Sequence, residues 1–143
     1  MCNETVELLK ECNSGCKMGL NSIRQVMEFT EDKKLKDALQ RAIASHEKLE
    51  AEIGKQLHAN GMKEESPGLM ASAMSWISTE MKMVLKGSTH EVAKIMMDGC
   101  NMGIQSICEY KNKYKNASPE SQKLAEDIIR TEENFMKEMK QFL

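Results

Sequence analysis

GCKMGLNSI, the sequence of residues 15–23, returns 84 residues later as GCNMGIQSI at residues 99–107. The two stretches agree at six of nine positions, in the pattern G-C-x-M-G-x-x-S-I. Self-similarity of this kind within one chain indicates a structural unit that is present twice. We therefore expect two related halves placed around a pseudo-twofold axis.

Both stretches lie in segments whose apolar residues recur at steps of three and four, which is typical of a helix that buries one face. In the first segment the repeating positions are Val6, Leu9, Asn13, Cys16, Leu20, Ile23 and Met27. The same spacing predicts helices over residues 3–29, 32–59, 89–115 and 119–142. Short connections between the first two and between the last two make each pair an antiparallel hairpin.

Capping signals set the expected ends of these helices. Thr30 or Asp32 suits the start of the second helix, and Ser118 followed by Pro119 suits the start of the last one. Asn60-Gly61 is a favourable stop. A further amphipathic helix is expected over residues 67–86, in the connection between the two hairpins. The predicted fold is thus a single all-α domain over residues 1–143, a four-helix bundle with a fifth helix in the crossover.

The composition excludes several classes of function. Twenty basic residues against 22 acidic ones give a net charge of -2, which provides no electrostatic surface for nucleic acid or an anionic membrane. No apolar run approaches the roughly 20 residues needed to span a bilayer. The N-terminal residues show no signal peptide, so we expect a cytoplasmic protein. Five cysteines then indicate free thiols or metal ligands rather than disulfides.

Four residues with metal-binding side chains are expected at one level in the middle of the bundle: Cys16, His46, Cys100 and Glu132. Each lies about 15 to 17 residues from its hairpin turn, and a helix rises about 1.5 Å per residue, so their heights should agree. Two interpretations stand. The layer could bind Zn²⁺ or Fe²⁺. Alternatively, His46 and Glu132 satisfy each other's buried polar groups by a hydrogen bond, and the cysteines pack as small hydrophobic residues.

Four glycines inside the predicted helices also need an explanation, because each costs roughly 1 kcal/mol against alanine. They are Gly15, Gly19, Gly99 and Gly103. One explanation is a close approach of two helices, and the other is an opening for a ligand.

The chain resembles the ferritin-like superfamily, and within it a bacterial, rubrerythrin-related family of four-helix bundles of unknown function. The resemblance rests on Asp98-Gly99, on the similar Ser14-Gly15, and on the crossover segment at 68–86 with Trp76. It implies the four-helix fold over nearly the whole chain.

Ferritin-like enzymes hold two irons with a Glu on each of two helices and Glu-x-x-His on the other two. Carried over to this sequence, the resemblance places Cys16 and Cys100 at the first two positions. Ile43 and Ile129 stand where the motif has its glutamates, so a conventional di-iron centre is not expected. The resemblance therefore implies a non-catalytic binding or assembly protein, without catalytic residues, that forms a homo-oligomer. The alternative is a Zn or Fe protein, or a redox protein, that uses the Cys/His/Glu layer.

Overall fold

The computed structural model describes residues 3–62 and 76–143, and within these ranges the regular elements are helices, with no strand. The α-helices among them are α1 (Asn3–Met27), α2 (Lys33–Ala59), α4 (Thr79–Leu85), α5 (Thr89–Lys113) and α6 (Pro119–Met139), and a short 3-10 helix, η1 (Lys140–Phe142), follows. None of these helices combines the length and the hydropathy needed to cross a bilayer.

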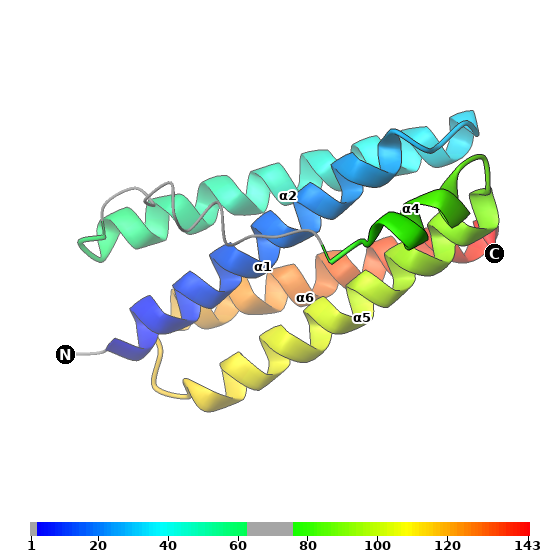
Figure 1. Ribbon diagram of the computed structural model, residues 1–143. Coiled ribbons are helices and arrows are strands. Elements are labelled where there is room, and N and C mark those ends of the chain that lie inside the picture. The colour runs from blue at the N-terminus through cyan, green and yellow to red at the C-terminus, as the bar shows by residue number, and fades with distance from the viewer. Residues whose placement is uncertain (1–2, 63–75) are drawn as a thin grey trace.

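The four long helices form a bundle of two antiparallel hairpins, as the sequence predicts (Figure 1). Helix α1 pairs with α2, and α5 pairs with α6. The hairpins join through α1, which packs on α5 and α6, and through α2, which packs on α6. Helix α4 lies against α5 at the end of the bundle that also holds the C-terminus (Figure 1). The repeated stretches thus lie on neighbouring helices, α1 and α5.

Aspartate and serine side chains cap the N-termini of α2 and α6 at the positions that the sequence predicts. Asp32, rather than Thr30, caps α2 by accepting a hydrogen bond of 2.9 Å from the backbone N–H of Leu35. Ser118 caps α6, and Pro119 takes its first position. Gly61 follows α2 with φ of 82°, a left-handed conformation that glycine adopts without a Cβ penalty.

The crossover helix is shorter than predicted. Helix α4 begins at Thr79, and Ser78 caps it by accepting a hydrogen bond from the backbone N–H of Met81. Residues 76–78 are described and are not helical, so the prediction of a helix there is wrong. The rest of the predicted segment, residues 67–75, lies outside the described residues.

Three long helices also end a few residues earlier than predicted, and among them α5 stops at Lys113 instead of at residue 115. Helix α1 stops at Met27. Thr30 follows the helix, and its hydroxyl donates a hydrogen bond of 2.7 Å back to the carbonyl of Val26 in the last turn. Helix α6 stops at Met139 and tightens into η1. Such changes in the last turn leave the packed length of the bundle unaffected.

The buried apolar side chains form two clusters, one toward each end of the bundle. The cluster near α4 includes Leu39 of α2 and Phe135 of α6, and the other includes Ile53 of α2 and Ile128 of α6. His46 on α2 and Glu132 on α6 are polar residues that lie between these positions.

Candidate functional site

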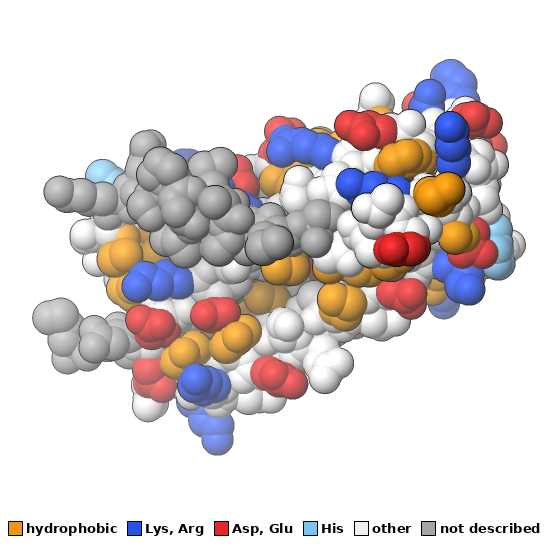
Figure 2. Space-filling view, viewed as in Figure 1, with side chains coloured by type: hydrophobic (Ala, Val, Ile, Leu, Met, Phe, Trp, Pro, Cys, Tyr) orange, Lys and Arg blue, Asp and Glu red, His pale blue; other side chains and the backbone are white. Residues whose placement is uncertain are grey.

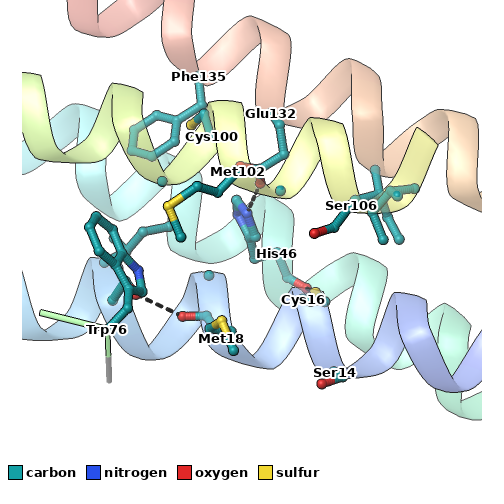
Figure 3. A pocket seen from close by; sticks show the side chains of 18 of the residues that line it. Ser14, Cys16, Met18, His46, Trp76, Cys100, Met102, Ser106, Glu132 and Phe135 are labelled. Carbon is teal, nitrogen blue, oxygen red and sulfur yellow. Dashed lines mark hydrogen bonds and ion pairs between the residues drawn. The ribbon is translucent and has the colours of Figure 1, made fainter. Parts of the chain in front are cut away.

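His46 and Glu132 form a hydrogen-bonded pair inside the bundle. The side chain of His46 is 2% exposed and that of Glu132 is 12% exposed, and His46 Nε2 bonds to Glu132 Oε1. Figure 3 shows the two side chains meeting between α2 and α6. The sequence interpretation that this pair satisfies its own polar groups thus agrees with the geometry.

Hydrogen bonding fixes where the protons of this pair lie. His46 Nδ1 is 2.7 Å from the Ala42 carbonyl oxygen, which only accepts, so Nδ1 carries a hydrogen. Nε2 and a carboxylate oxygen cannot both accept, so a further proton lies between them. Burial opposes a charge on His46, but the hydrogen bond and the charge of Glu132, together with the Ala42 carbonyl, raise the pKa of His46. The raised pKa favours the protonated, imidazolium form of His46 opposite Glu132.

The two repeated cysteines lie near this pair on different helices, Cys16 on α1 and Cys100 on α5. The Cys16 thiol lies 3.2 Å from the His46 carbonyl oxygen and donates to it. Burial, followed by the charges of Glu50 and Glu132, raises the pKa of Cys16 to about 12. Burial and then the charge and hydrogen bond of Glu132 also raise the pKa of Cys100. Both thiols are therefore protonated at neutral pH.

This arrangement uses the four predicted ligands without bringing them to a common centre. The Cys16 thiol is directed at the backbone of α2, whereas the Cys100 thiol lies close enough to Glu132 for this carboxyl group to raise the pKa of the thiol. Within residues 3–62 and 76–143, no group of three or more His, Cys, Asp or Glu side chains is placed to hold a metal ion. The four residues thus lie in one part of the bundle without a shared point of coordination, and metal binding stays a prediction.

A cleft of about 270 Å³ opens beside the pair, between α1 and α5. Side chains of α2 and α6 form its floor, among them His46, Glu132 and Phe135 (Figure 3). On α1 the lining residues run from Glu11 to Ile23, about 18 Å along the helix axis. Ligand pockets commonly begin at about 300 Å³, so this cleft suits a molecule of about one ring with a short chain.

The four glycines of the repeated stretches, Gly15, Gly19, Gly99 and Gly103, all line this cleft. A Cβ built at Gly103 would lie 3.7 Å from Glu132 Oε2, and one at Gly19 would lie 3.3 Å from the His46 ring. Among the described residues, the one atom of another element within 4 Å of a Cβ at Gly15 is on the Ile107 side chain. In the same part of the chain, no backbone of a neighbouring helix comes that close to these three positions, so the opening explains them better than a close helix approach does.

The two ends of the cleft differ, although the sequence repeat relates them. At one end Trp76 fills the space beside Gly99, where a Cβ would lie 3.0 Å from the indole ring. At the other end the charge of Glu11, and then its hydrogen bond, raise the pKa of Tyr110. The cleft therefore has an aromatic end and an acidic end.

The cleft was not predicted from the sequence, and Glu11, Met102 and Tyr110 were not among the predicted site residues. Trp76 was predicted on a crossover helix and Met102 within the repeat, but neither pattern shows that the side chain faces a cavity. The paired glycines were the available signal, because they mark the walls on both helices.

The arrangement of the helices is that of a ferritin-like bundle, and a solved structure with the same fold agrees. The crystal structure of Dps92 from Deinococcus radiodurans is similar with a TM-score of 0.82, over 99% of this chain and 87% of that one, at 13% sequence identity. The chain belongs to the family described as "Domain of unknown function (DUF2383)", whose sequence model matches residues 4–113. No curated protein matches the chain. The matched range ends with α5, so α6 and Glu132 lie beyond it.

Proposed function

We propose that this protein is a non-catalytic binding protein that holds a small molecule in the cleft between α1 and α5. The observation that carries the proposal is the set of four glycines in the cleft walls. Each costs roughly 1 kcal/mol of helix stability, and none of the three on the open part of the cleft serves a close backbone contact. This loss of helix stability is explained if the glycines keep the cleft open.

The chemistry of the floor supports binding rather than catalysis. Both ring nitrogens of His46 are already hydrogen-bonded, one to the Ala42 carbonyl and the other to Glu132, so neither is free to act as a base toward a ligand. The nearby thiols are protonated and buried, and so are poor nucleophiles. The remaining lining is largely apolar, as in small-molecule sites whose few polar groups orient a ligand.

The sequence alternative, a Zn or Fe protein using Cys16, His46, Cys100 and Glu132, gains no support from the geometry. A metal would have to displace the hydrogen bond between His46 and Glu132 and remove protons from two buried thiols. The expected relation to rubrerythrins, the bacterial origin and the cytoplasmic location stay expectations.

Assembly of several copies is the second part of the proposal, and exposed apolar side chains on α4 support it. Met83 is 77% exposed and Val84 is 56% exposed, next to each other in the chain. Figure 2 shows hydrophobic side chains on the surface over α4. Neighbouring exposed apolar groups of this kind are favourable in a protein–protein contact.

Trp76 provides a direct test of the binding proposal, because it is the only tryptophan in the chain and it lines the cleft. We would titrate three probes of matched size, 2-phenylethylamine, propylbenzene and phenylacetate, and follow Trp76 fluorescence and backbone amide NMR shifts. At least one probe should saturate and shift amides of α1 and α5. In Gly15→Leu, whose side chain fills the cleft beside Ile107, that binding should be lost. If none of the three binds at the cleft, the proposal is wrong.

A further inference from the structure

One oxygen of Glu132 is left accessible from the cleft. Oε1 bonds to His46, whereas Oε2 faces Gly103, where a Cβ would lie 3.7 Å away. Because glycine has no side chain, nothing from position 103 covers this oxygen, and the Glu132 side chain stays 12% exposed. A carboxylate offers about four acceptor sites in all, so Oε2 can accept a further donor beside the Cys100 thiol.

The charges along the cleft have one predominant sign. Among the described residues that line it, the charged side chains are Glu11, His46 and Glu132, and none is Lys or Arg. The charge of His46 is compensated by Glu132, so Glu11 leaves the lining acidic. The Ser22 hydroxyl, a donor that an anion could use, already donates 2.9 Å to the Met18 carbonyl.

Aromatic and thioether side chains surround the accessible oxygen. Trp76, Phe135 and Met102 lie together near Glu132 in the cleft (Figure 3). Aromatic faces attract an organic cation, most strongly where water is excluded. Such a lining is poorly suited to a strongly hydrated cation, whereas it can pack against a hydrocarbon group.

From this juxtaposition, and building on the proposed function, we propose that the cleft binds a small apolar amine as its ammonium ion. The nitrogen donates to Glu132 Oε2 beside Gly103, and the hydrocarbon part packs on Trp76, Phe135 and Met102. Carboxylates and phosphates are excluded, because the lining has no cation left to pair with them.

The same three probes test this inference by their order of affinity. A hydrogen bond to a charged group should make 2-phenylethylamine bind about tenfold or more tightly than propylbenzene. Phenylacetate should bind most weakly. If propylbenzene or phenylacetate binds as tightly as the amine, the ammonium inference is wrong, while the proposed binding function stands. If no probe binds, both fail.

Gly103→Ala provides the matched variant, because its added methyl fits at ordinary contact distance and covers Glu132 Oε2. It should weaken 2-phenylethylamine about tenfold and propylbenzene much less. Gly54→Ala is the control: Gly54 is also inside a helix, but a Cβ there would have no atom within 4 Å. It should leave all three affinities unchanged. An equal loss for amine and hydrocarbon in Gly103→Ala would show a purely steric effect and overturn the assignment of Glu132 as the ammonium partner.

Discussion

His46 Nε2 and Glu132 Oε1 join the two hairpins of the bundle by a hydrogen bond inside the core. The two residues lie at comparable positions of the second helix of each hairpin. Two glycines at equivalent positions of the sequence repeat, Gly19 and Gly103, lie beside them. The buried pair and the opening beside it thus lie at comparable positions of the two hairpins.

Removing one member of the pair should destabilise the protein strongly. His46→Leu or Glu132→Met leaves the other charge buried and unpaired, which costs about 3 kcal/mol or more. The double variant should be much closer to the original protein, because apolar side chains of similar volume replace both charges. Urea unfolding measures the three free energies. If the loss of unfolding free energy in the double variant equals the sum of the losses in the two single variants, the two residues are not coupled and this prediction is wrong.

The stability contributed by the pair should depend on pH in one direction. The pKa of His46 is raised in the folded protein above its ordinary value of 6.5. Its contribution is therefore fully present just below pH 6.5 and is lost as the pH rises through the raised pKa. Unfolding free energies measured from pH 6 upward should show this decline in the original protein. Glu132→Gln should show a smaller decline; an identical one would contradict the assignment.

Alanine substitutions should separate the glycines of the cleft from an ordinary helix glycine. Gly54→Ala should stabilise the protein by about 1 kcal/mol, because Gly54 lies inside α2 and meets nothing. Gly19→Ala should stabilise the protein less than Gly54→Ala does, or destabilise it, since the new Cβ would lie 3.3 Å from the buried His46 ring. Thermal melts compare the two variants. An equal gain at both positions would show that the His46 ring moves freely.

Zinc and iron should be absent at stoichiometric levels. The Cys16 thiol donates to the His46 carbonyl, and burial raises the pKa of both repeated cysteines. Elemental analysis of freshly purified protein should find well under one metal per chain, and added Zn²⁺ or Fe²⁺ should leave Tm unchanged. About one metal per chain, lost in Cys16→Ser and Cys100→Ser, would establish the metal site instead.

The assembly proposal predicts that α4 lies in a contact between copies. Light scattering after size exclusion should give a mass above that of one chain. Met83→Lys with Val84→Lys should reduce it, because both side chains are exposed and are not needed inside the bundle. A monomer before the change, or an unchanged mass after it, would contradict this part of the proposal.

The sequence was sufficient for the bundle because its signals are local and agree with one another. The period of apolar residues, the Ser118-Pro119 start and the Gly61 stop each depend on neighbours along the chain. The pairing of His46 with Glu132 was also within reach, because helix rise converts residue counts into heights. Helix lengths and turn positions were thus enough to predict which residues lie at the same level in the middle of the bundle.

The cleft was not predictable in the same way. Whether Gly15 and Gly99 bring helices together or hold them apart depends on the side chains opposite, Ile107 and Trp76. Trp76 reaches Gly99 from a non-helical stretch before α4, which the apolar period of the crossover had suggested to be helical. Long-range placement of this kind leaves no local pattern in the sequence.

Xenon is the most direct probe of the central claim that the glycines keep a cleft open for a small molecule. Xenon enters apolar cavities without needing polar partners. Crystals pressurised with xenon should show an anomalous scatterer between α1 and α5, beside Gly103 and within contact of Phe135. The same crystals of Gly15→Leu should show it weakened or gone. No xenon between these helices, with their side chains closed over His46 and Glu132, would contradict the account.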